Sequence, residues 1–71
     1  MSVMQTVYAA AEDAQNGKIS EEQLITQLEE AGKQLEDDRQ LEVVETVLKS
    51  KLDADLAEEA VEAVRRGKGS S

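Results

Sequence analysis

The 71-residue chain carries a formal net charge of −8 and contains no histidine, cysteine, tryptophan, phenylalanine or proline. The lack of histidine and cysteine removes the usual zinc ligands and nucleophile–base pairs, so we expect no enzyme and no metal or cofactor site. Sixteen acidic residues against eight basic ones disfavour direct contact with nucleic acid and with membranes, because both contacts begin with lysine and arginine.

Length and composition also set expectations about assembly and location. A domain of this size buries a small core. Without a disulfide or a metal staple it gains stability by association, so a homodimer is one expected arrangement. No stretch approaches the ~20 apolar residues that cross a bilayer, and residues 1–17 lack the basic start and apolar run of a signal peptide. We expect a cytoplasmic protein, with secretion through other signals left open.

The first predicted helix covers residues 2–16 and is amphipathic, because its apolar residues recur at spacings of three and four. Asn16 and Gly17 end it, since both residue types tolerate a positive φ. The apolar side is formed by Val3, Met4, Val7, Tyr8, Ala11 and Ala14.

The second predicted helix starts at the clearest local signal of the chain, a capping box of Ser20 and Gln23, in which each side chain bonds the backbone N–H of the other residue. Gly32 is expected to mark its C-terminal end, with residues 33–36 as a connector, because glycine inside a helix costs about 1 kcal/mol relative to alanine. Continuation of the helix through Gly32 is the alternative. The apolar stripe consists of Leu24, Ile25, Leu28, Ala31 and Leu35.

The third predicted helix begins near Asp37 or Asp38, either of which can act as the N-cap, and Asp37 with Gln40 forms a second, weaker capping box. Its valine pairs lower helix propensity, so packing has to hold this segment in place. One apolar line consists of Leu41, Val44 and Leu48, and Val43 and Val47 lie beside it.

Residues 52–55, with the sequence Leu-Asp-Ala-Asp, are the ambiguous joint of the chain. They favour a turn or kink in which Asp53 or Asp55 caps a final helix, because aspartate prefers caps to helix interiors. One long helix over residues 37–66 is the alternative. The same four letters resemble the turn of the repressor-of-primer family of helical hairpins, and a likeness over four residues implies nothing about function.

The last predicted helix ends at Arg65 and Arg66, whose positive charges suit the C-terminal end of the helix dipole. Residues 67–71 are expected to form a flexible C-terminal tail. The sequence therefore predicts an all-α fold, with a single helical domain over residues 1–66. We expect a small bundle of three to four short antiparallel helices arranged as helical hairpins.

One loop resembles an EF-hand, since residues 12–23 place Gly17 at loop position six, as that family does. The ligand positions depart from the family pattern: Glu12 stands at position one, Ala14 at position three and Gln23 at position twelve. Calcium requires six to eight oxygen ligands, several of them carboxylates. We therefore expect a capped turn between two helices rather than a calcium site.

Adjacent carboxylates occur at three places in the chain. Neighbouring residues on a helix do not face each other, so solvated helix surfaces explain these pairs better than acid–base catalysis in a cleft does. The pairs are Glu29 and Glu30, Asp37 and Asp38, and Glu58 and Glu59.

Two groups of apolar residues are the candidate protein interface. Tyr8, the one aromatic residue of the chain, lies on an apolar stripe and fits a core or half-core position. Alternatively it anchors an interface, because tyrosine is enriched in binding hot spots. The candidates are Val3, Met4, Val7 and Tyr8 in the first helix and Leu41, Val43 and Val47 in the third.

Missing reactive groups and abundant apolar helix faces together predict a non-enzymatic protein–protein interaction module, such as a bacterial or viral adaptor, assembly factor or regulatory subunit. The alternative is an acidic inhibitor of a basic or nucleic-acid-binding protein: a DNA mimic, an anti-defence protein or an immunity protein. In both cases the expected partner is another protein.

Overall fold

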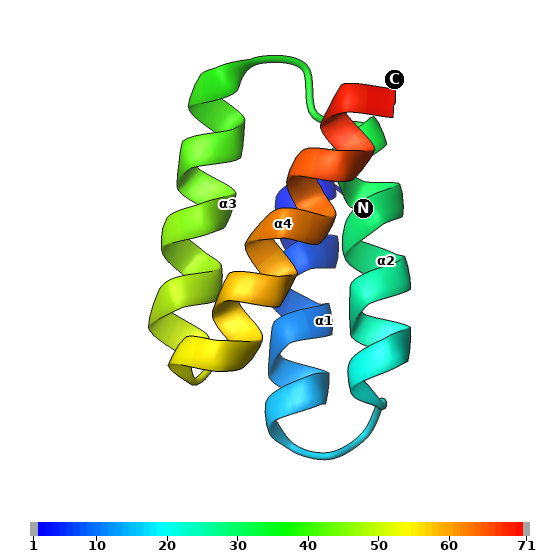
Figure 1. Ribbon diagram of the computed structural model, residues 1–71, viewed down its shortest axis with the longest axis vertical. Helices are drawn as coiled ribbons and strands as arrows, with labels where there is room; N and C mark the ends of the chain where they lie inside the picture. The colour runs from blue at the N-terminus through cyan, green and yellow to red at the C-terminus, as the bar shows by residue number, and fades with distance from the viewer. Residues whose placement is uncertain (1, 71) are drawn as a thin grey trace.

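The computed structural model describes residues 2–70, and this part of the chain forms four α-helices (Figure 1). The helices are α1 (Val3–Gln15), α2 (Glu21–Lys33), α3 (Asp38–Lys51) and α4 (Ala54–Ser70). No strand occurs within the described residues. The predicted all-α bundle is confirmed, with four helices in a body of 29 × 21 × 19 Å.

Capping boxes start the first two helices. The Ser20 hydroxyl accepts from the Gln23 amide at 3.1 Å, and the Gln23 side-chain oxygen accepts from the Ser20 amide at 2.9 Å. Ser2 and Gln5 repeat this arrangement at the start of α1, with both distances 3.2 Å. The capping box predicted for α2 is therefore confirmed. The capping box of Ser2 and Gln5 was not predicted, because the start of α1 was inferred from its apolar spacing alone.

Aspartates start the other two helices. Asp37 accepts from the Gln40 amide at 2.9 Å, while the Gln40 side chain accepts from the Glu36 amide at 2.7 Å instead of closing the box. Asp53 accepts from the Leu56 amide at 3.0 Å and so caps α4. Both caps satisfy amides that have no partner inside the helix.

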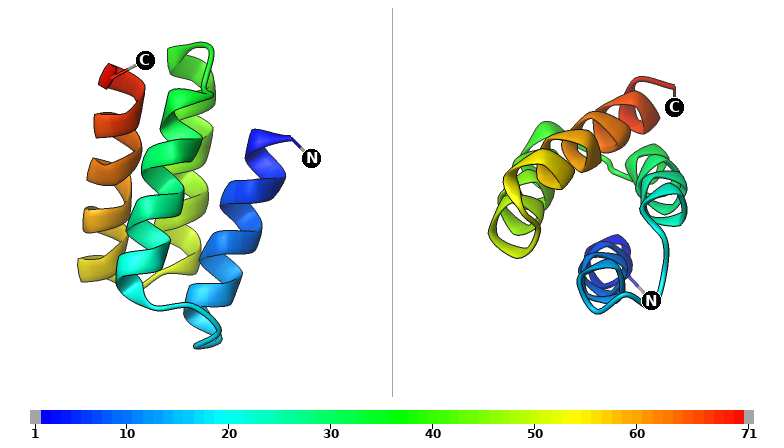
Figure 2. Two further views of the ribbon diagram at one scale, coloured as in Figure 1. Left: turned by 90° about the vertical axis from the view of Figure 1, so that its right-hand side faces the viewer. Right: turned by 60° about the horizontal axis from the view of Figure 1, so that its bottom comes forward.

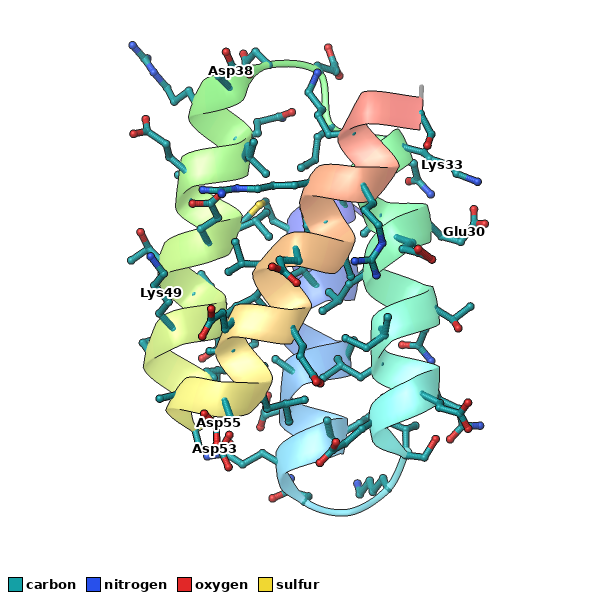
Figure 3. The ribbon with its side chains drawn as sticks, viewed as in Figure 1. Glu30, Lys33, Asp38, Lys49, Asp53 and Asp55 are labelled. Atoms are coloured by element: carbon teal, nitrogen blue, oxygen red, sulfur yellow. The ribbon has the colours of Figure 1, made fainter. Side chains whose placement is uncertain are left out.

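The joint between α3 and α4 is a tight turn, so the alternative of one long helix is wrong. α3 ends at Lys51, and Leu52 takes extended backbone dihedrals (φ −109°, ψ 157°). Figure 3 shows Asp53 and Asp55 together at this turn. Asp53, which directly precedes α4, provides the cap, and Asp55 falls in the first turn of α4, where a negative charge suits the helix dipole.

The turn between α1 and α2 follows its prediction. Asn16 is the C-cap of α1, and Gly17 adopts φ +75°. A left-handed φ is available to glycine without steric cost. The chain therefore reverses sharply, and α2 returns alongside α1 (Figure 1).

The four helices pack in a ring in which α1 and α4 each contact both α2 and α3. Consecutive helices are antiparallel, as predicted. The most extensive contact, however, joins α2 to α4, and these two helices run in the same direction (Figures 1 and 2). The link from α2 to α3 crosses the end of the bundle to make this arrangement.

Two buried glycines bring α2 and α4 together. A Cβ atom at Gly32 would collide with the Val64 carbonyl oxygen and lie 3.1 Å from the Gly67 Cα atom. A Cβ atom at Gly67 would collide with the Glu29 carbonyl oxygen. The predicted C-cap at Gly32 is wrong: α2 continues to Lys33, because this glycine serves contact between helices rather than helix termination.

The predicted tail over residues 67–71 is also wrong for the part that the structure describes. α4 continues through Ser70, and Gly67 is buried against α2. The contact of Gly67 with α2 stabilises one further turn of α4 beyond Arg66, since short helical segments depend on tertiary packing. Residue 71 lies outside the described residues.

The core consists of apolar side chains, and among residues 2–70 no polar side chain is buried with it. Six of its fifteen members are alanine, which lets the helices approach closely but contributes little apolar area for each residue. The members are Val7, Ala10, Ala11, Leu24, Leu28, Ala31, Leu35, Val44, Leu48, Leu52, Ala57, Ala60, Val61, Ala63 and Val64.

Candidate protein-docking surface

The large apolar side chains that remain exposed among residues 2–70 belong to two neighbouring helices. Tyr8 of α1 is 48% exposed and Val43 of α3 is 47% exposed, and α1 packs against α3. Met4, one turn before Tyr8, and Val47, one turn after Val43, are half-buried. We call these four residues (Met4, Tyr8, Val43 and Val47) the α1–α3 surface.

A cation links the two halves of the α1–α3 surface. The Nζ atom of Lys51, on α3, lies 4.2 Å from the centroid of the Tyr8 ring on α1. An ammonium group over an aromatic face is attracted by the electron density of the ring. The contact holds the exposed ring beside α3, so that Tyr8 belongs to a surface made by both helices.

Not all of the predicted interface residues reach the surface. Val7 is 1% exposed and lies in the core, so its assignment to an interface is wrong. Val3 and Leu41 are half-buried and pack against the core, as Met4 does. Tyr8 is half-exposed, so it lies outside the core, and its part as an interface anchor stays a prediction.

Sequence reasoning missed the part of Lys51 in this surface. The available signal was its spacing, because Arg39, Val43, Val47 and Lys51 follow one another at intervals of four residues. Each step of four residues turns about 40° around a helix of 3.6 residues per turn. The row therefore winds from the exposed Arg39 toward α1, where Lys51 meets Tyr8.

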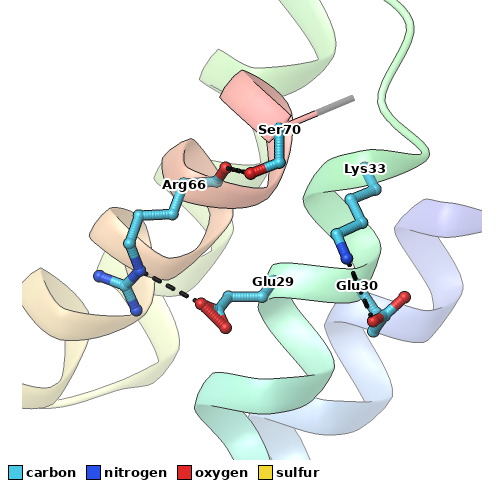
Figure 4. A network of polar contacts seen from close by, with 5 residues as sticks. All are labelled: Glu29, Glu30, Lys33, Arg66 and Ser70. Carbon is cyan, nitrogen blue, oxygen red and sulfur yellow. Dashed lines mark hydrogen bonds and ion pairs between the residues drawn. The ribbon is translucent and has the colours of Figure 1, made fainter.

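The arginines of α4 are engaged in ion pairs with neighbouring helices. Arg65 donates from Nε and Nη2 to the two carboxylate oxygens of Glu45, at 2.8 and 3.1 Å. This hydrogen bond, together with the negative charge of Glu45, raises the pKa of Arg65 above its usual value. Arg66 donates to Glu29 at 3.2 Å across the α2–α4 contact (Figure 4). These arginines therefore join α4 to both of its neighbours.

A second surface is acidic. A shallow hollow of about 310 Å³ between α2 and α4 is lined by three carboxylates together with Ile25 and Thr26. The carboxylates belong to Glu21, Glu22 and Glu59. We call these five residues the α2–α4 surface. It gathers negative charge around a small apolar centre.

The loop that resembles an EF-hand is used for helix capping. The Gln23 side chain accepts from the Ser20 amide, and the Glu12 carbonyl accepts from the Asn16 amide at the end of α1. Within residues 2–70, no group of three acidic, histidine or cysteine side chains is placed to hold a metal ion.

No helix in the described part of the chain has both the length and the apolar character that a membrane span requires. Comparison of the chain with models of protein families, with curated proteins and with solved structures found no match.

Proposed function

We propose that this protein is a non-enzymatic interaction module that binds another protein through its α1–α3 surface. One observation carries the proposal: the exposed large apolar side chains, Tyr8 and Val43, lie on two helices that pack together. Grouped apolar side chains on a surface mark interaction sites more often than isolated ones do. An adaptor, an assembly factor or a regulatory subunit would use such a surface.

Tyrosine suits an anchor in this position. Its ring buries a large apolar area and its hydroxyl keeps a polar partner. The contact with Lys51 holds the ring in place before a partner arrives, which lowers the entropy lost on binding. The half-buried Met4 and Val47 add apolar area around it.

The test is affinity capture of partners from the cells that make the protein, with wild type compared with Tyr8→Asp and Val43→Asp. Both positions are exposed, so the fold should survive, which circular dichroism checks. Gln27→Asp is the matched control, because it places the same new charge on the exposed side of α2. We expect Tyr8→Asp and Val43→Asp to lose a partner that Gln27→Asp retains. Retention of all partners by all three variants would overturn the proposal.

The acidic α2–α4 surface favours a second candidate function, inhibition of a basic or nucleic-acid-binding protein. Three carboxylates around Ile25 would meet a basic groove. Affinity for such a target should fall steeply as salt rises, because exposed charges are screened. The double variant Glu21→Gln and Glu59→Gln should weaken that complex, and Val43→Asp should leave it unchanged.

A further inference from the structure

We infer that Asn16 is a site of spontaneous covalent modification, at which the turn between α1 and α2 opens and the Gly17 backbone nitrogen displaces the side-chain amide. This inference goes beyond the proposed function and does not depend on it. It is carried by the pairing of Asn16 with Gly17 in an exposed turn (Figure 1). Asn16 is also the one asparagine of the chain, so the product can be assigned to a single residue.

The reaction converts an amide into a carboxylate and consumes one water molecule. The Gly17 nitrogen loses its proton and attacks Cγ of Asn16, and the Cγ–Nδ2 bond breaks to release ammonia and leave a five-membered succinimide ring. Water then adds to one of the two ring carbonyls and cleaves its bond to the Gly17 nitrogen. Cleavage at Cγ gives aspartate, whereas cleavage at the main-chain carbonyl gives isoaspartate, whose backbone runs through Cβ and Cγ. No oxidant or reductant takes part.

Glycine at position 17 favours this attack. A side chain on the residue after asparagine crowds the attacking nitrogen, and glycine has none. The surroundings are open as well, because a Cβ atom at Gly17 would meet nothing within 4 Å. Asn16, Gly17 and Lys18 are all exposed, so water reaches the turn and ammonia leaves it.

The folded turn holds the reacting atoms apart. Asn16 has ψ 2°, which aligns the Gly17 nitrogen with the Asn16 nitrogen and not with Cβ. Because Cα is tetrahedral, ring closure requires roughly a third of a full turn about the Cα–C bond. That rotation breaks the hydrogen bonds from the Gly17 amide to the Ala14 carbonyl (3.2 Å) and from the Lys18 amide to the Asp13 carbonyl (2.8 Å). Modification therefore requires the turn to open.

Opening of the turn does not require the bundle to unfold. Residues 16–18 are exposed, and the turn is closed by backbone hydrogen bonds at the end of α1. Exposed segments of this kind open at a much lower free energy than the core does. Ala14 before the turn and Ile19 after it both pack against the core, so the opening is confined to the residues between them.

The product no longer fits the turn. Its carboxylate stands at the C-terminal end of α1, where the helix dipole disfavours a negative charge. It also follows Glu12 by four residues, a spacing at which like charges repel. In isoaspartate the main chain is longer by one carbon atom, which shifts the Gly17 amide away from the Ala14 carbonyl. Modification therefore loosens the joint between α1 and α2.

The test is incubation of the full-length protein at mildly alkaline pH, followed by peptide mapping. Trypsin cleaves after Lys18, so the first peptide contains Asn16, and enzymatic methylation with chromatographic retention identifies isoaspartate in it. We expect isoaspartate in excess over aspartate, because water attacks the main-chain carbonyl of the succinimide more readily. Gln15 is the internal control, since its longer side chain closes a ring only slowly. An unmodified peptide, or aspartate alone, would overturn the inference.

The rate of modification tests the part played by the turn. Protein unfolded in guanidinium chloride should react at least about tenfold faster than native protein, because the turn no longer restrains Asn16. Guanidinium concentrations below the unfolding transition should leave the native rate nearly unchanged, because local opening exposes little surface. Equal rates in native and unfolded protein, or a native rate that climbs steeply with denaturant, would overturn opening of the turn as the controlling step.

Thermal unfolding tests the consequence for the fold. Asn16→Asp reproduces the new charge without the longer main chain and should lower Tm by a few degrees. The isoaspartate form, separated by ion exchange, should have a lower Tm than Asn16→Asp. Asn16→Gln is the control variant, which keeps the amide and should accumulate no isoaspartate. An isoaspartate form with the Tm of the unmodified protein would overturn the loosening of the joint.

Discussion

Substitution of Gly32 by alanine should destabilise the protein, although alanine is the better helix former. The new methyl group would gain about 1 kcal/mol of helix propensity. It would also collide with the Val64 carbonyl oxygen and lie 3.0 Å from the Lys68 backbone nitrogen. Neither backbone atom can rotate away as a side chain would, so α2 and α4 must separate.

The magnitude follows from the size of that separation. Restoring ordinary contact requires a shift of roughly 1 Å, which loosens the apolar contacts of α4 with α2. Overpacking of this kind costs about 1–3 kcal/mol. The cost for Gly32→Ala lies at the upper end of this range, because the new methyl group meets backbone atoms, which cannot move aside as a side chain can. After the gain in propensity, the net loss is about 2 kcal/mol. A domain of this length has roughly 4–11 kcal/mol of stability in total, so the loss is a large share.

Thermal and urea unfolding followed by far-ultraviolet circular dichroism measure the effect. A loss of about 2 kcal/mol should lower Tm by roughly 8–16 °C, and Gly67→Ala should behave like Gly32→Ala. Gly69→Ala is the control, because a Cβ atom there meets nothing within 4 Å, and it should leave Tm unchanged or slightly raised. If Gly32→Ala matched Gly69→Ala, close glycine packing would not hold these helices together.

Three further changes test other parts of the fold. Ser20→Ala removes the hydroxyl of the α2 capping box and should cost about 1 kcal/mol in urea unfolding; an unchanged midpoint would mean that water replaces the cap. Gly17→Ala forces a side chain into φ +75° and should cost about 1 kcal/mol, whereas a gain in stability would contradict the turn. Glu45→Gln removes the charge that faces Arg65, whose side chain is exposed, and should lower the midpoint of urea unfolding slightly in low salt and less in high salt, so a loss that salt leaves unchanged would contradict a screened ion pair.

Local signals in the sequence were sufficient to place most helix boundaries. Ser20 and Gln23 predicted the start of α2, and Asn16 with Gly17 predicted the end of α1. The two aspartates of residues 52–55 predicted a turn and not a continuous helix. Each of these signals acts within four residues, where the chemistry of the cap decides the backbone conformation.

The glycines at positions 32 and 67 show why the rest could not be predicted. Within its own segment, each glycine looks like a helix terminator. Its actual role depends on a backbone more than thirty residues away, which no local pattern reveals. The same long-range contact explains why α4 continues beyond Arg66, and why the parallel α2–α4 pair was not foreseen.

The candidate surface was predicted in part. Apolar spacing selected the two helices that carry the exposed Tyr8 and Val43, but Val7 and Tyr8 are adjacent, and the pattern placed both on one stripe. Val7 is buried together with Ala10 and Ala11, whose small side chains allow α1 to lie close to its neighbours. Tyr8 is thereby turned toward α3 and solvent, an outcome that depends on how the helices pack.

The parallel packing of α2 against α4 has a consequence for the order in which the chain folds during synthesis. Gly67 is translated 34 residues after α2 ends at Lys33, which takes a ribosome about 2–7 s. Throughout that interval the apolar stripe of α2 lacks its principal neighbour, while the α1–α2 hairpin has only its own few contacts. Folding is therefore completed by the helix that is made after the other three, because α2 has no comparable neighbour before α4 is present.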